Sequence, residues 1–142
     1  MDEHILSQIA LDSNSLFELV DNDTFKLTLQ IEVSFKLGSF DDMASEIKVS
    51  AQDQLSRAFG DFLTQCDDVL HKSDLRKECG LKVTDKVERT VDTSLGTVKF
   101  KRRYYKDEND ERLYLLDAVF GVTPRMRVSK NLSAELVNNA AV

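Results

Sequence analysis

"KVERTVDTSLGTVKFKRRYYKDENDERLYLL", residues 86–116, has the pattern of a small antiparallel β-sheet. Apolar and polar residues alternate in two long runs, as expected for half-buried β-strands. Short segments rich in turn-forming residues separate these runs and precede a third apolar run. The stretch predicts a three-stranded antiparallel β-meander. Its strands are 86–93, 97–106 and 111–116, and its turns are 94–96 and 107–110.

Upstream of this meander the apolar period changes to that of a helix. From Asp41 to about Ser73, apolar residues recur mostly at three- and four-residue steps and no proline intervenes. Asp41 or Ser39 can cap the start, and acids in the first turn suit the helix dipole. We predict one long amphipathic helix. Because its polar face is rich in aspartate, we do not expect that face to contact DNA directly.

The outer segments carry weaker patterns. Residues 3–20 indicate one or two short helices, and the alternation of residues 25–37 favours a strand, although packing as a helix stays open. After the meander, Asp117 is a candidate N-cap for a short helical piece that Gly121 to Pro124 end. Ser129 is a candidate N-cap for a last helix. The predicted class is α+β: N-terminal helices including the long amphipathic one, the three-stranded meander, and a C-terminal helix.

Length and charge predict one module with two unlike parts. The chain has 142 residues and a net charge of −6, which fits a single module over 1–142. Residues 1–75 hold 15 acidic and 5 basic side chains, whereas residues 76–142 hold 10 acidic and 14 basic ones. We expect an acidic, mainly helical part and a basic part with different partners. The last helix reaches the chain end uncapped, so we expect the module to be cut from a longer protein.

The strand 97–106 concentrates cations that suit nucleic-acid phosphates. Alternation places Lys99, Lys101 and Arg103 in one outward row at roughly 6–7 Å spacing, with Tyr105 at its end. Such a row favours salt-sensitive, sequence-independent contact with a DNA backbone. Arg102 falls on the opposite face, where a structural pairing with Glu88 or Asp117 is expected. The candidate DNA-binding residues are Lys99, Lys101, Arg103, Tyr105, Lys106 and Arg89.

Other chemistry has little support in the residues. A lysine-rich solvated sheet face is the plain alternative to a DNA contact. Cys66, His71 and Cys79 do not have the spacing of a common zinc site, and Cys66 fits a buried helical stripe. We expect no catalytic residues, metal, cofactor or small-molecule substrate in this chain. No apolar run reaches the roughly 18 residues of a membrane helix, so a cytoplasmic protein is expected.

The residues from Arg89 to Gly121 resemble a family of bacterial insertion-sequence transposases of the DDE type, long filed as an uncharacterised family. The resemblance covers about residues 59–142. It rests on Arg89-Thr90, Thr93, Gly96, Val98, Phe100, Arg102 to Tyr105, Tyr114 to Asp117 and Gly121, with Ser129 and Leu132. In some related transposases the hairpin tip is a metal ribbon with cysteines. Here that tip has no cysteine, which further weakens a zinc site.

The resemblance implies a non-catalytic front-end module. Such a module precedes a helix-turn-helix-like region and an RNase-H-like core, so the catalytic acids of the family are expected beyond position 142. We therefore predict a DNA-binding and assembly module of an insertion-sequence transposase, with transposon-end DNA as partner. The alternative is an oligomerisation or scaffold module without DNA contact, in which the 41–73 helix and residues 25–37 form the interface of a homodimer.

Overall fold

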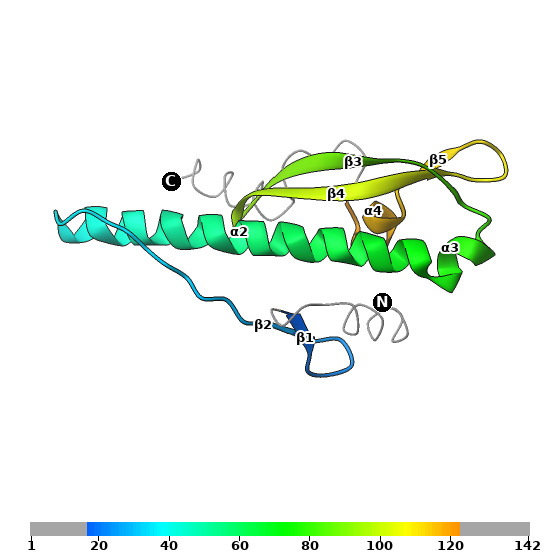
Figure 1. Cartoon of the computed structure of the whole chain (residues 1–142). Helices are drawn as coiled ribbons and strands as arrows, with labels where there is room; N and C mark the ends of the chain where they lie inside the picture. Colours follow the sequence, from blue (N-terminus) through cyan, green and yellow to red (C-terminus); the bar gives the residue numbers. More distant parts are fainter. Residues whose placement is uncertain (1–16, 123–142) are drawn as a thin grey trace, which may run out of the picture.

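The computed structural model describes residues 17–122, which form one long helix beside a β-hairpin (Figure 1). The class is α+β, as predicted. A small hairpin comes first, made of β1 (Phe17–Leu19) and β2 (Phe25–Leu27). The helices α2 (Phe40–Lys72) and α3 (Asp74–Glu78) follow. The last elements are β3 (Lys82–Thr93), β4 (Gly96–Lys106), β5 (Arg112–Leu113) and α4 (Leu115–Phe120).

Helix α2 confirms the long helix that the sequence predicts. At its start the Ser39 hydroxyl accepts a hydrogen bond from the Asp42 backbone N–H at 3.2 Å, so Ser39 is the N-cap. Asp41 and Asp42 lie in the first turn, where the helix dipole favours negative charge. At the other end the backbone N–H of Ser73 donates to the Leu70 carbonyl at 3.2 Å. At 1.5 Å per residue, the 33 residues span about 50 Å.

The sheet has the predicted meander order β3-β4-β5, but its strands and first turn differ in length from the prediction. Thr93 pairs with Gly96, whose φ of +103° suits a tight turn, so two residues connect β3 and β4. The third strand is shorter than predicted, because α4 begins at Leu115. Leu115 and Leu116 are both buried. Consecutive residues of a strand face opposite ways, whereas a helical turn lets both leucines reach one core.

The edge of β4 that β5 leaves uncovered lies against α2. The backbone N–H of Lys101 donates to the Thr64 hydroxyl at 3.0 Å. Arg103 donates its backbone N–H to the Asp67 carboxylate at 3.1 Å. Gly60, one turn earlier, lies so close to Lys99 that a Cβ there would be 2.1 Å from the Lys99 carbonyl oxygen. Helix α2 thus satisfies and closes a strand edge that would otherwise be open.

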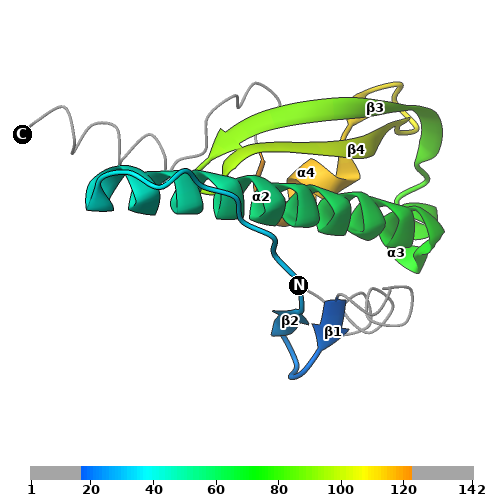
Figure 2. The same ribbon diagram turned by 60° about the vertical axis from the view of Figure 1, so that its left-hand side comes forward.

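The hydrophobic core lies where the C-terminal half of α2 meets the hairpin and α4 (Figure 2). The buried residues come from every one of these elements, so each depends on the others for burial. They are Leu63, Cys66, Val69, Leu70, Leu81, Val91, Val98, Phe100, Tyr105, Leu115 and Leu116. The β1–β2 hairpin joins through Phe62 of α2, whose ring centroid lies 5.2 Å from those of Phe17 and Phe25.

Three predictions for the outer segments need comment. The strand predicted over 25–37 is wrong beyond Leu27, because β1 offers partners to Phe25–Leu27 alone and a strand needs a partner for its backbone. The helices predicted over 3–20 are wrong at Phe17–Leu19, which is β1; residues 3–16 lie outside the described part. The helix predicted from Ser129 also lies outside it.

Candidate functional site

Lys99 and Lys101 are the two predicted contact residues that lie free on the surface of β4. Both are exposed, and neither has a described carboxylate within 4.0 Å. Strand pairing places Thr90 opposite Lys99 and Glu88 opposite Lys101. The outward row that the sequence predicts is therefore present at these two positions, with one acid beside it.

Arg103 continues this row but is tied to α2. Its guanidinium lies 2.8 Å from Asp67 and 2.8 Å from Asp68, and its side chain is 18% exposed. Burial alone would lower the pKa of Arg103, but the two carboxylates outweigh it and raise that pKa. Asp68 also binds the Lys86 ammonium at 3.0 Å. The expectation of an outward Arg103 is corrected: the helix that covers the strand edge supplies its partners.

Tyr105 is inside the protein, which corrects its predicted place at the exposed end of the row. Its side chain is fully buried, and its hydroxyl lies 3.2 Å from Nδ1 of His71. The two rings stack with centroids 6.1 Å apart. Burial raises the pKa of Tyr105 to about 12. Burial also lowers the pKa of His71, and the positive charges of Arg103 and Arg76 lower it further. His71 lies in the last turn of α2, so this end of the helix covers Tyr105.

Arg89 is also buried, which corrects its prediction as a DNA-contact residue. Arg89 and Arg102 both bind the Asp117 carboxylate, at 3.2 Å and 2.9 Å. The structural pairing of Arg102 with Asp117 is thereby confirmed. Asp117 does not cap α4 as predicted, since Tyr114 is the N-cap residue and Gly121 is the C-cap. Burial raises the pKa of Asp117, and the two guanidiniums oppose that shift.

Lys106 belongs to a cluster that the sequence did not reveal. Strand pairing places Lys82 on one side of Lys106 and Arg112 on the other, and we call these three residues the cation triad. Directly opposite positions of neighbouring strands lie about 5 Å apart, and like charges there repel. Among residues 17–122, no carboxylate lies within 4.0 Å of any of the three. The guanidinium of Arg112 instead lies over the Tyr104 ring, 5.4 Å from its centroid.

One acid of the neighbouring turn, Asp107, is engaged by backbone groups of that turn. The Asp107 carboxylate accepts hydrogen bonds from the backbone N–H groups of Asn109 and Glu111, at 2.8 and 2.9 Å. Only the register across three strands identifies Lys82 and Arg112 as neighbours of Lys106. Counting outward from the first turn would place Val83 opposite Lys106, but the β-bulge between Val83 and Asp85 shifts the register by one residue and brings Lys82 there instead.

The predicted DNA-contact residues thus separate into two surfaces and an interior group. Lys99 and Lys101 share one face of β4. Alternation places Lys106 and its triad on the other side of that strand. Arg103, Tyr105 and Arg89 are held by contacts inside the protein.

The described residues provide neither a metal site nor a membrane-spanning helix. No group of three or more His, Cys, Asp or Glu residues among residues 17–122 is placed to hold a metal ion. Cys66 is buried, which raises the pKa of its thiol to about 12, while Cys79 is exposed. Within the same part of the chain, no helix combines the length and the apolar character that crossing a membrane requires.

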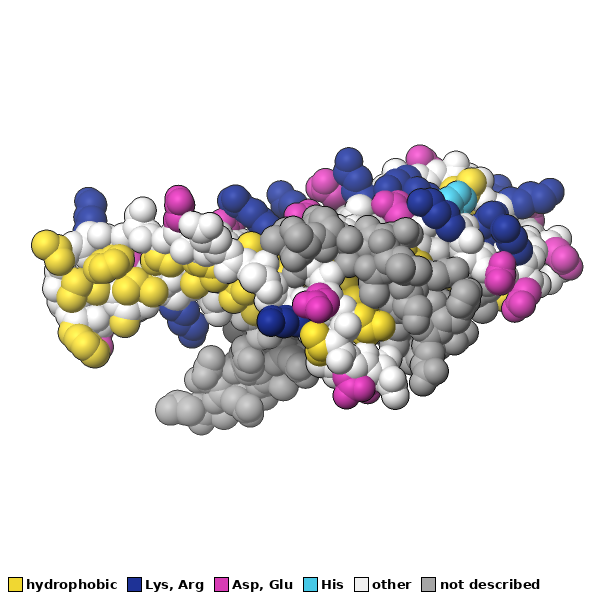
Figure 3. All heavy atoms as spheres, turned by 60° about the horizontal axis from the view of Figure 1, so that its bottom comes forward, with side chains coloured by type: hydrophobic (Ala, Val, Ile, Leu, Met, Phe, Trp, Pro, Cys, Tyr) yellow, Lys and Arg dark blue, Asp and Glu magenta, His cyan; other side chains and the backbone are white. Residues whose placement is uncertain are grey.

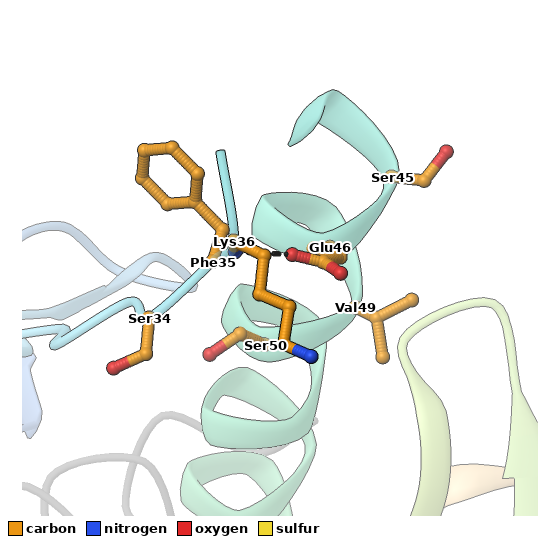
Figure 4. Close-up of a pocket in the computed structure, with 7 residues that line it drawn as sticks. All are labelled: Ser34, Phe35, Lys36, Ser45, Glu46, Val49 and Ser50. Atoms are coloured by element: carbon orange, nitrogen blue, oxygen red, sulfur yellow. Dashed lines mark hydrogen bonds between the residues drawn. The ribbon is translucent and has the colours of Figure 1, made fainter. Parts of the chain in front are cut away.

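The N-terminal end of α2 extends beyond the sheet (Figure 1), and apolar side chains gather there (Figure 3). Leu37 is 91% exposed, Phe40 82% and Val49 66%. An open groove of about 710 Å³ lies between residues 34–36 and this end of the helix (Figure 4). Phe35 points away from the helix at its rim. This apolar surface is the second candidate site.

Comparison with known proteins shows that this chain is similar to one protein family. A family model described as "Uncharacterised protein family (UPF0236)" matches residues 36–142. A UPF0236 protein of Caldanaerobacter subterraneus subsp. tengcongensis is 29% identical over 142 aligned positions, and the match covers 99% of this chain and 29% of the relative. The name of that relative joins eleven locus designations. Another UPF0236 protein of that organism is 30% identical over 89 residues, 62% of this chain and 19% of the relative.

This chain spans less than a third of the length of these curated relatives. No solved structure matches it. The family model covers most of the chain, including the long helix, the whole meander and α4. The chain belongs to the uncharacterised protein family UPF0236.

Proposed function

We propose that this chain is a non-catalytic, DNA-contacting N-terminal module of an insertion-sequence transposase. The resemblance of residues 89–121 to DDE-type transposases supports this proposal. So does the relative whose name joins eleven locus designations, because a mobile element copies its gene to many sites of one genome. Catalysis would then belong to the part of the relatives that this chain does not span. The cytoplasm, where bacterial DNA lies, is the location that the proposal requires.

The cation triad is the observation that carries the DNA contact. Three cations held side by side, with no carboxylate of residues 17–122 within 4.0 Å, repel one another, and a phosphate group would relieve that repulsion. Lys99 and Lys101 add a second basic surface on the other face of β4. Each phosphate neutralised by a lysine or arginine releases counterions, so the binding would depend steeply on salt and little on base sequence.

A salt series of DNA-binding measurements tests the proposal. The wild-type chain should bind a mixed-sequence duplex, with an affinity that falls linearly as salt rises on logarithmic axes. Replacing Lys82, Lys106 and Arg112 with glutamine should reduce the slope by about 0.9 for each lost phosphate contact. The pair Lys99→Gln and Lys101→Gln should reduce it independently if both faces contact DNA.

The matched control is the pair Lys26→Gln and Lys48→Gln, which removes exposed lysines from β2 and α2. This pair should leave the slope unchanged. Absence of binding by the wild-type chain would contradict the DNA function. If all variants had the same salt dependence as the wild type, neither basic surface would be part of the DNA interface.

A second function, assembly of copies of this chain, has its own observation. Exposed apolar side chains at the N-terminal end of α2 form a surface that a soluble monomer rarely leaves uncovered. We infer an oligomerisation role that does not require DNA. Light scattering should give a molar mass above the 16.1 kDa of one chain. A mass of one chain at every concentration would contradict this role.

A further inference from the structure

Residues 28–37 run as an extended segment beside α2, without a partner strand among residues 17–122 (Figures 1 and 2). Side chains of α2 provide its hydrogen bonds. The Glu32 backbone N–H donates to Gln54 Oε1 at 3.2 Å, and the Gln54 amide donates to the Glu32 carbonyl at 2.7 Å. The Lys36 backbone N–H donates to Glu46 Oε2 at 2.7 Å, as Figure 4 shows.

These bonds define which backbone edge of the segment is open. In an extended chain, the N–H and C=O groups of one residue point to one side, and those of the next residue point to the other. Glu32 and Lys36 are even-numbered and face α2. The backbone groups of Ile31, Val33 and Phe35 therefore face away from the helix. Within the described part of the chain, none of these three makes a backbone hydrogen bond.

The side chains of the segment also have the pattern of a paired strand. Apolar residues alternate with polar ones from Phe25 to Leu37 without a break. Yet Phe35 is 47% exposed, and Leu37 is more exposed still. An open backbone edge with an alternating apolar pattern is the surface to which another strand adds.

The charged residues of the segment favour one register of pairing with a second copy of this chain. If the segment pairs antiparallel with the same segment of a second copy, its register is defined by the residue on the two-fold axis. Centring on Ser34 places Glu32 opposite Lys36 of the second copy, and symmetry makes this pair occur twice. Centring on Glu32 would place that residue opposite itself, and centring on Ile31 would place Lys26 opposite Lys36. Among centres from 30 to 34, Ser34 alone pairs opposite charges.

The Ser34 register also agrees with the open edge. It makes Val33 and Phe35 a hydrogen-bonded pair across the axis, and their backbone groups are those that face away from α2. Ser34 and Glu32 then occupy positions that exchange no backbone hydrogen bonds with the second copy, and at such positions the side chains of opposite strands lie closest. The hydrogen bonds to Gln54 and Glu46 remain in place, so pairing requires no loss of a contact that the monomer makes.

We propose that two copies of this chain pair antiparallel through residues 31–37, with Ser34 on the two-fold axis. The resulting two-stranded sheet has α2 of one copy along each outer edge. The inference rests on the proposed oligomerisation role and is independent of the DNA contact.

A disulfide trap tests the register. In such a position the two Cα atoms lie about 4.5 Å apart, within the range that a disulfide spans. Ser34→Cys, made in a Cys79→Ser background, should form a disulfide-linked dimer on mild oxidation, seen on a non-reducing gel. Cys66 stays in place because it is buried. The matched control is Ser45→Cys on α2, which should remain largely unlinked.

Charge reversal tests the same pairing in solution. Glu32→Lys and Lys36→Glu each create like-charge pairs and should lower the molar mass toward 16.1 kDa, measured by light scattering. The double variant restores opposite charges and should restore the dimer. Circular dichroism shows whether each variant is folded.

The outcomes separate the inference from the functions proposed above. A monomeric wild-type chain would overturn both this pairing and the oligomerisation role. A dimeric chain whose Ser34→Cys variant does not cross-link, and whose charge variants stay dimeric, would overturn this pairing alone. Neither result bears on the salt series with DNA, because Lys82, Lys99, Lys101, Lys106 and Arg112 lie outside the segment.

Discussion

Asp67 of α2 holds Arg103 of β4 by both its backbone and its side chain. The carboxylate oxygens accept the Arg103 backbone N–H at 3.1 and 3.2 Å, and Oδ2 lies 2.8 Å from the guanidinium. Asp67 is itself 1% exposed. One aspartate therefore closes the strand edge and also withdraws a cation from the surface, so the burial of Asp67 depends on Arg103 being present.

Arg103→Glu should unfold or strongly destabilise the protein. The substitution places a third carboxylate beside Asp67 and Asp68 and leaves Asp67 buried without its partner. Breaking a buried ion pair costs about 3–5 kcal/mol, and urea denaturation measures the loss. Lys101→Glu is the control, since Lys101 is exposed and makes no ion pair with any residue of 17–122. A fully stable Arg103→Glu variant would contradict this view of the edge. DNA-binding variants should therefore keep Arg103.

Asp117→Asn should cost about 3–5 kcal/mol of unfolding free energy, because it leaves the buried guanidiniums of Arg89 and Arg102 without their shared counter-charge. Thermal or urea denaturation measures the change. Asp53→Asn is the matched control, since its ion pair with Arg57 is on the surface and such pairs contribute little. Equal stability of the two variants would show that the Asp117 cluster is not a major source of stability.

Gly60→Ala should separate α2 from β4. The added Cβ would meet the Lys99 carbonyl oxygen at 2.1 Å, and backbone on both sides leaves no flexible group to move. Overpacking of this kind costs about 1–3 kcal/mol or more, measured as a lowered urea midpoint. Gly38→Ala is the control, because nothing among residues 17–122 lies within 4 Å of its new Cβ, and its midpoint should stay close to that of the wild type. Alanine by itself favours a helix over glycine. An unchanged or raised midpoint for Gly60→Ala would therefore contradict the close approach of Lys99.

His71 should make the protein lose stability as the pH falls below about 6.5, the pKa of histidine in an unfolded chain. Burial, Arg103 and Arg76 lower the pKa of His71 in the folded state. The unfolded state then binds more protons in this window, so the free energy of unfolding decreases as the pH decreases.

The measurement compares urea denaturation at pH 7.5 and 5.5 in the wild type and in His71→Gln. The glutamine side chain can still meet the Tyr105 hydroxyl but does not titrate. The difference between the two proteins isolates His71 from the buried acids, whose pKa values are shifted in the opposite sense. Identical pH dependence in both proteins would exclude the proposed contribution of His71.

Much of the fold could be predicted because it depends on local patterns. The apolar period from Asp41 to Ser73 and the Ser39 cap gave the helix, and alternation around the turn at Gly96 gave the hairpin. The candidate site was predictable only in part. Alternation correctly separated Lys99 and Lys101 from Arg102. It could not indicate that α2 covers Tyr105, or that Lys82 and Arg112 flank Lys106, since those relations join residues distant in sequence.

Local patterns were enough to place the turns of the meander, the start and end of α2, and the residues of β4 that share a face, because near neighbours set backbone preference and period. The tertiary structure decided which charges remain on the surface. Asp67 and Asp68 bind Arg103, and Asp117 binds Arg89 and Arg102, because α2 and α4 pack against the sheet at those points. It also decided that residues 28–37 have no partner strand in the part of the chain that the structure describes. A strand is completed only by hydrogen bonds to another strand, and no local pattern supplies that partner.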